Sequence, residues 1–248
     1  MASFLRKLQY PIILKMLETA QSDKILDVGC GGGELAVMVS NECTYIGVDS
    51  LFNAVKNKHA LKNTILINAH AERLPFKDEY FDKIVVSSVL QMVSDDMKVL
   101  LECRRVLKRK GKLVLSVPLD YCVIKKLYFY SKNQIINKFL RIIGLPENYE
   151  NLKKEFIVKF GAKGQGFYTK DEVKRKLCQA DFIVSYTEYS PKRLGTFIYE
   201  LMLIVCRVFR MPLFHSYYNT FMYPFIYLDR YLSSHSKGCE IIICARAH

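Results

Sequence analysis

A glycine-rich turn at the end of a short apolar run constrains the fold of this chain more than any other feature. The run at 24–28 leads into Gly29, Gly31 and Gly33, and residues 34–41 then have the character of a helix. Glycines suit such a turn because it is tight, and because a ligand can approach the backbone where no Cβ intervenes. The pattern predicts a strand, a ligand-binding loop and a helix.

Strand and helix signals continue to alternate through the first 118 residues. The expected strands cover 24–28, 44–49, 64–68, 81–88 and 112–117. The expected helices cover 34–41, 51–60 and a stretch from a Ser94–Asp96 cap to about Lys108, where Gly111 is expected to end it. This order is typical of a doubly wound, mostly parallel α/β sheet.

The second half is less regular but contributes two more strands. Thr169 and Glu172 form a predicted capping box that opens a helix to about Ala180. Strands are expected over 181–189 and, within a residue or two, 239–245. Apolar residues at roughly helical spacing occupy 119–143, and a loop is expected over 144–168.

Two carboxylates flank the glycine loop. Asp27 precedes the first glycine by two residues, at the strand edge where α/β folds bind ligands. It could receive a cationic amino group directly or through water, whereas it would repel a diphosphate. Asp49 ends the next strand and, about 20 residues after the loop, can accept hydrogen bonds from both hydroxyls of a ribose. A purely structural strand–turn–helix is the alternative.

Taken in order, the motifs resemble those of class I S-adenosylmethionine-dependent methyltransferases, in the small-molecule, ubiquinone-type branch. The matching segments are ILDVGCGGGELA, YIGVDS, NAHAERLPF, FDKIVVSSVLQMV and RRVLKRKGKLVLSVP, with a weaker match over 167–184. The resemblance implies a Rossmann-like, seven-stranded sheet whose last strand is antiparallel. It also implies S-adenosyl-L-methionine as cofactor and S-adenosyl-L-homocysteine as product, but it says little about the methyl acceptor.

The resemblance further implies which residues bind the cofactor. Asp27 and the glycines would hold the methionine part, Asp49 the ribose, and Leu51 would lie against the adenine. His70 stands where the family usually has Asp, and its neutral ring nitrogen can still accept a hydrogen bond from the adenine amino group. The expected cofactor-binding residues are Asp27, Gly29, Cys30, Gly31, Gly33, Asp49, Ser50, Leu51, His70, Ala71 and Ser87.

The sequence names no general base and no metal ligand set. Methyl transfer from a sulfonium is an in-line displacement, so the protein mainly aligns the acceptor and excludes water. Ser87, Ser88 and Gln91 follow the fourth strand and are expected to line the acceptor side. Further candidates, whose segments can fold over the cleft, are Tyr10, Tyr168 and His215.

Residues 190–238 separate the last two expected strands and are rich in Phe, Tyr, Leu and Ile. The methyltransferase domain is therefore expected over 1–189 and 239–248, with a helical insert between. The apolar stretches in the insert are too short, and too interrupted by Glu200 and Arg207, to predict a membrane span. A lid over the acceptor, a membrane contact and ordinary core packing remain open.

Positive charge is concentrated in the second half of the chain. Residues 1–118 carry 17 Lys and Arg against 13 Asp and Glu, or +4, and residues 119–248 carry 20 against 11, or +9. This balance suggests an anionic partner, either nucleic acid, anionic lipid or a phosphorylated substrate, or else a plain basic surface. The eight cysteines include no C-x-x-C pair and suggest no disulfide framework. The apolar N-terminus is interrupted by Lys, Arg and Pro11, so no signal peptide is predicted. Both features favour a cytoplasmic protein, either peripheral to a membrane or free of it.

These features predict a methyltransferase that acts on a hydrophobic or lipid-like small molecule. An RNA methyltransferase is the first alternative, although SSVL rather than an N-P-P-Y-like tetrapeptide follows the fourth strand. A cofactor-binding protein without turnover is the second. The sequence does not indicate the oligomeric state.

Overall fold

The fold is described here from a computed structural model, for residues 4–39, 43–51, 63–119, 151, 167–190 and 240–248. The chain divides into two compact units, one of 1–118, 163–188 and 241–248 and one of 119–162 and 189–240. The first unit contains the expected cofactor motifs. Three predicted segments lie outside the described residues except for their first residue: the expected helix over 51–60, the stretch of roughly helical spacing over 119–143, and the insert at 190–238.

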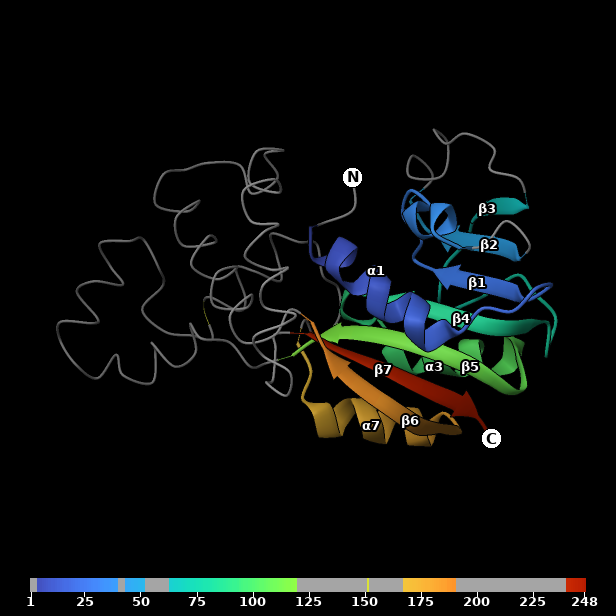
Figure 1. The fold of residues 1–248 in the computed structure, drawn as a ribbon. Coiled ribbons are helices and arrows are strands. Elements are labelled where there is room, and N and C mark those ends of the chain that lie inside the picture. The colour runs from blue at the N-terminus through green and yellow to red at the C-terminus, as the bar shows by residue number, and fades with distance from the viewer. Residues whose placement is uncertain (1–3, 40–42, 52–62, 120–150, 152–166, 191–239) are drawn as a thin grey trace, which may run out of the picture. The chain divides into compact units, whose positions relative to one another are not determined.

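The first unit is built on a seven-stranded sheet in the order β3-β2-β1-β4-β5-β7-β6 (Figure 1). The strands are β1 (Lys24–Val28), β2 (Thr44–Asp49), β3 (Thr64–Asn68), β4 (Phe81–Ser87), β5 (Leu107–Pro118), β6 (Phe182–Tyr189) and β7 (Glu240–Ala247). The first five pair in parallel. The predicted doubly wound sheet is confirmed.

β7 runs against its neighbours, as the arrow directions in Figure 1 show. Ser190 N–H donates to the carbonyl of Glu240, and at the other end of the pair His248 N–H donates to the carbonyl of Asp181. Opposite ends of β6 and β7 therefore meet, which defines an antiparallel pair. The sheet is mixed, with the antiparallel last strand that the family resemblance implied.

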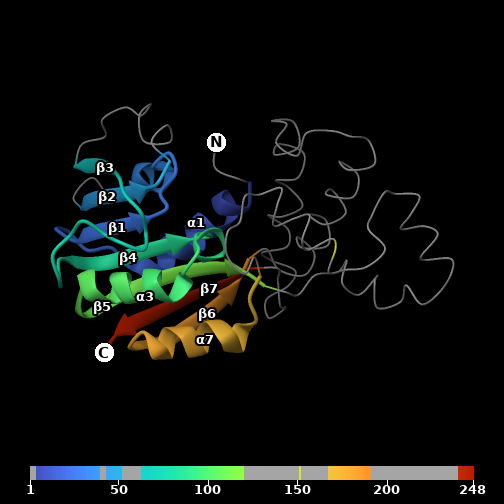
Figure 2. The same ribbon diagram turned by 180° about the vertical axis from the view of Figure 1, so that it is seen from behind.

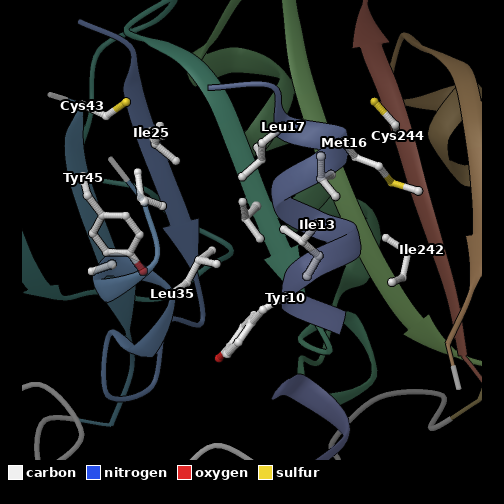
Figure 3. Close-up of a cluster of buried hydrophobic side chains, with 14 residues drawn as sticks. Tyr10, Ile13, Met16, Leu17, Ile25, Leu35, Cys43, Tyr45, Ile242 and Cys244 are labelled. Carbon is white, nitrogen blue, oxygen red and sulfur yellow. The ribbon is translucent and has the colours of Figure 1, made fainter. Parts of the chain in front are cut away.

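One face of the sheet is covered by α1 (Phe4–Leu17), which has Pro11 in its interior. Tyr10, Ile13, Met16 and Leu17 pack with residues from β1, β4, β5 and β7 in one hydrophobic cluster (Figure 3). No helix was predicted over these residues from the sequence. Burial of this apolar face outweighs the helix-breaking effect of one proline.

The opposite face is covered by α3 (Asp96–Val106) and α7 (Lys170–Gln179) (Figure 2). The buried face of α3 presents Val99, Leu100, Cys103 and Val106. The predicted capping box of α7 is confirmed, because Thr169 Oγ1 accepts from Glu172 N–H at 3.2 Å. Asp95, rather than Ser94, is the N-cap of α3.

The segment after α3 differs from the prediction. The helix ends at Val106, and Gly111 lies inside β5 instead of ending a helix. Leu107 is fully buried and pairs with Phe81 of β4, which draws the chain into the sheet. Likewise, only a short 3₁₀ helix, η1 (Glu34–Val37), follows the glycine loop within the described residues.

Candidate cofactor site

The glycine loop takes a conformation that other residues rarely adopt. Gly29, Gly31 and Gly33 have φ values of +71°, +52° and +70°. A Cβ on Gly29 would lie only 2.3 Å from Cγ2 of Val89. The N–H groups of Gly29 and Cys30 donate to the carbonyl of Val48 at 2.7 and 3.0 Å. The loop is therefore fixed against the carboxyl end of β2.

The Asp49 carboxylate connects the end of β2 to this loop. Its Oδ2 accepts from Gly31 N–H at 2.8 Å, and its Oδ1 accepts from Leu51 N–H at 2.9 Å. The Asp49 carbonyl accepts from Ala69 N–H at 3.1 Å, just after β3. Each carboxylate oxygen has a second lone-pair direction, so Asp49 is held in place and retains acceptor capacity.

Asp27 lies at the same edge of the sheet but is buried, with 5% of its surface exposed. It pairs in register with Gly47 of β2, and Tyr45, two residues earlier on that strand, donates its phenol hydrogen to Oδ2 of Asp27. Burial, followed by the negative charge of Asp27, raises the pKa of Tyr45 well above its usual value. The phenol therefore stays protonated and remains a donor.

The close packing of Cys30 depends on Gly47. A Cβ at Gly47 would lie 2.7 Å from both Sγ of Cys30 and Cδ2 of Leu66. Cys30 is itself buried. Its place in the loop is thus explained by packing against β2 and β3.

The remaining expected cofactor residues lie around the ends of β2 and β3. Ser50, Leu51 and His70 are exposed, and Ala71 is half-buried. Leu51 is 70% exposed although it is apolar, and its backbone N–H donates a hydrogen bond to the Asp49 carboxylate. An exposed leucine at this position is suited to contact a flat apolar ring.

A buried polar cluster occupies the carboxyl ends of β4 and β5. Gln9 Oε1 accepts from the hydroxyls of Ser87 and Ser116 at 3.1 and 2.8 Å, and Ser88 N–H donates to Ser116 Oγ at 3.1 Å. Ser88 has a left-handed φ of +53°. The cluster, defined as Gln9, Ser87, Ser88 and Ser116, joins α1 to the edge where acceptor contacts are expected.

The acceptor-side candidates are not all placed alike. Ser87 is buried in the polar cluster, and Gln91 has a buried Oε1 with no hydrogen-bond partner among the described residues. Tyr10 lies on the buried face of α1, in the hydrophobic core. Tyr168 is buried and donates to Asp96 at 2.9 Å, which is a structural link between α7 and α3. His215 lies outside the described residues.

Three residues at this edge were missed in the sequence: Gln9, Tyr45 and Ser116. Tyr45 had a usable signal, because side chains two apart on a strand share a face and Tyr45 precedes Gly47 by two. Gln9 had none. Its partners are 78 and 107 residues away along the chain.

The residues at this edge fit the charge and the hydrogen-bonding groups of S-adenosylmethionine. A buried carboxylate suits an ammonium group, and a half-buried carboxylate held by the loop suits a ribose diol. Between them runs a positive-φ glycine loop whose backbone has no side chains to keep a ligand away.

Comparison with known proteins agrees with this geometry. Residues 26–115 match the methyltransferase domain family. A demethylmenaquinone methyltransferase of Thermotoga maritima is 34% identical over 107 residues, covering 42% of this chain and 47% of that protein. The chain spans about half the length of the curated relatives it matches.

Solved structures share the fold at low identity. Geranyl diphosphate C-methyltransferase from Streptomyces coelicolor A3(2) superposes with a TM-score of 0.63 at 15% identity, covering 98% of this chain and 80% of that chain. The cyclase SpnF has a TM-score of 0.57 at 16% identity, covering 96% and 79%. Since one fold hosts different reactions, the assignment depends on the loop, the two carboxylates and the sequence match together. Residues 26–115 therefore match an S-adenosylmethionine-dependent methyltransferase domain, and their sequence is similar to that of demethylmenaquinone methyltransferases.

Proposed function

We propose that the protein transfers a methyl group from S-adenosylmethionine to a small, hydrophobic acceptor. The observation that carries the choice of methyl donor is the pair of carboxylates, Asp27 and Asp49, on either side of the glycine loop. The names of the similar proteins refer to demethylmenaquinone and geranyl diphosphate, both small molecules. They support a small-molecule acceptor for this chain.

We propose the cofactor-binding roles that the family resemblance implies, and the geometry of the sheet edge supports them. Asp27 pairs with the α-ammonium of the methionine part, and Asp49 accepts hydrogen bonds from the ribose hydroxyls. Leu51 contacts the adenine ring, and His70 accepts from its amino group. Bound S-adenosylmethionine supplies a methyl group already activated by the sulfonium charge.

The remaining task of the protein is alignment and exclusion of water. The bond between methyl carbon and sulfur breaks as the acceptor atom forms its bond to that carbon, and the electron pair stays on sulfur. The polar cluster lies where β4 ends and Gln91 lies in the short 3₁₀ helix Leu90–Met92 that follows, so both border the acceptor. An acceptor hydroxyl must also lose its proton to a base or to water.

We also propose that residues 190–238, which lie outside the described residues apart from Ser190, add apolar contact area for the acceptor. This proposal depends on their composition alone. Apolar area stabilises a bound tail by about 25 cal/mol per Å² buried. Among the helices that the structure describes, none is long and apolar enough to cross a membrane.

The test uses the full-length chain and isotope-labelled S-adenosylmethionine. Turnover is compared on a total lipid extract, on total RNA and on water-soluble metabolites, and binding of S-adenosylhomocysteine is measured by calorimetry. Label in the lipid fraction supports the proposal. Label only in RNA, or cofactor binding without label in any fraction, would replace it with one of the two alternatives.

Deleting residues 194–235 with a short linker tests the role of the insert. The deletion should preserve S-adenosylhomocysteine binding and abolish turnover on lipid-like acceptors. Turnover at the original rate in a folded deletion variant would remove the insert from the acceptor site.

A further inference from the structure

The side chains of Tyr45 and Asp27 meet across two neighbouring strands of the sheet. The Tyr45 hydroxyl donates to Oδ2 of Asp27, and the two residues are 2% and 5% exposed. A buried carboxylate is costly unless it is hydrogen-bonded. A phenol meets that need without adding an opposing charge.

We propose that Tyr45 is a positioning residue, which orients the Asp27 carboxylate to receive the α-ammonium of S-adenosylmethionine. This inference rests on the proposed cofactor site. The terminal torsion of an aspartate is broad, so a single carboxylate can rotate unless a donor fixes its plane. A cationic partner in place of Tyr45 would cancel the charge that attracts the ammonium, whereas a neutral phenol leaves it intact.

The two parts of the Tyr45 side chain have separate roles. Its ring packs in the hydrophobic cluster with Ile25, Leu35 and Cys43. Its hydroxyl points along the direction in which β1 runs, toward the edge that holds the loop (Figure 3). Burial raises the pKa of this hydroxyl, so it stays protonated and donates at neutral pH. Phenylalanine would therefore keep the packing and remove only the hydrogen bond.

The experiment separates the amino-acid part of the cofactor from its nucleoside part. S-adenosylhomocysteine carries the α-ammonium, whereas 5′-methylthioadenosine has the same adenine and ribose but no amino-acid part. Binding of both is measured by calorimetry for the full-length native protein, Tyr45→Phe, Asp27→Asn, the double variant and the control Tyr80→Phe. Tyr80 stacks with Phe76 and has a Lys24 ammonium over its ring, so this control removes a phenol hydroxyl from another setting.

Tyr45→Phe should weaken S-adenosylhomocysteine binding about tenfold, the scale of one hydrogen bond to a charged group, and leave 5′-methylthioadenosine within about twofold. Asp27→Asn should show the same selectivity with a larger loss. The double variant should be no weaker than Asp27→Asn alone, because Tyr45 acts through Asp27. Tyr80→Phe should change neither ligand.

Equal losses for both ligands in Tyr45→Phe would show a merely structural role and overturn the inference, as would additive losses in the double variant. If Tyr45→Phe does not fold, Asp27→Asn still tests the inference. This variant should fold, because the amide oxygen of the asparagine can accept the hydrogen bond from Tyr45. Native-like S-adenosylhomocysteine binding in Asp27→Asn would overturn the inference. Failure of the native protein to bind S-adenosylhomocysteine would instead refute the proposed function.

Discussion

Asp49 Oδ2 and the backbone N–H of Gly31 are joined by a hydrogen bond of 2.8 Å, although the two residues come from different turns of the βαβ unit. One carboxylate thus fixes the shape of the glycine loop and stands beside the expected ribose position. The parallel register of β1 and β2 makes this possible, because it brings the two strand ends to one edge of the sheet.

Replacing Asp49 with alanine should weaken S-adenosylhomocysteine binding by about 1.5–3 kcal/mol, the scale of hydrogen bonds to a charged group. The loss has two sources, the ribose contacts and the loop contact. Calorimetry measures it, with Asp171→Ala on an exposed turn of α7 as the control. Unchanged affinity in Asp49→Ala would remove this residue from the cofactor site.

Gly29→Ala should reduce both stability and cofactor affinity. The new Cβ would meet Val89 Cγ2 at 2.3 Å, and the φ of +71° disfavours alanine by roughly 1–2 kcal/mol. Adding Val89→Ala to this variant should relieve the steric part and restore only some of the stability. Chemical unfolding of the two variants measures the difference. Full restoration by the second substitution would mean that backbone strain at Gly29 is negligible.

The sequence predicted β1, β2 and β3 to the residue, because each is an apolar run closed by a glycine, an aspartate or an asparagine. It misplaced the end of α3, because RRVLKRK has the basic residues expected at a helix C-terminus. Contacts with a distant part of the chain override this local helix signal. Leu107 is buried by pairing with Phe81, and Lys108 forms an ion pair with Asp82.

In the candidate site, too, local sequence patterns predicted some residues and missed others. Asp27, Asp49 and the glycines could be predicted because their spacing within one βαβ unit fixes where they meet. Gln9 could not, since its contacts to Ser87 and Ser116 require α1 to lie across two strands from later in the chain. The helix α1 was not predicted either, because Pro11 interrupts its sequence. When a helix packs against strands that are distant in the sequence, the residues that meet there have no recognisable spacing in the sequence.

Glu102→Gln should lower stability in a pH-dependent way. The hydrogen bond from Arg105, at 2.7 Å, holds the pKa of the Glu102 carboxyl below its ordinary value of 4.5, and the N–H of Leu74 adds to this effect. Because the folded-state pKa is the lower one, the stabilisation is complete above the ordinary pKa and is lost as pH falls through the folded-state value. The expected contribution at neutral pH is about 1 kcal/mol.

Urea unfolding of the native protein and Glu102→Gln between pH 3 and 8 measures this contribution. The difference between them should be constant above about pH 5 and shrink at lower pH. Glu79→Gln is the matched control, because its pair with Arg109 at 3.3 Å is largely exposed and should contribute little. A difference that grew toward acidic pH would contradict the assigned role of Arg105.

Ser116→Ala should destabilise the protein more than the removal of a hydroxyl that makes a single hydrogen bond at the surface. It removes the 2.8 Å bond to Gln9 Oε1 and one of the two acceptors of Ser88 N–H, which keeps its 3.0 Å bond to the Ser116 carbonyl, in a cluster where Gln9 and Ser116 are 0% and 1% exposed. Gln9 Oε1 keeps its bond from Ser87, so the expected cost is that of a lost buried hydrogen bond, about 1 kcal/mol. Ser185→Ala is the control, since its hydroxyl makes one bond of 3.0 Å to the Cys244 carbonyl from an exposed residue. If chemical unfolding shows equal stability for the two variants, the polar cluster does not hold α1 to the sheet.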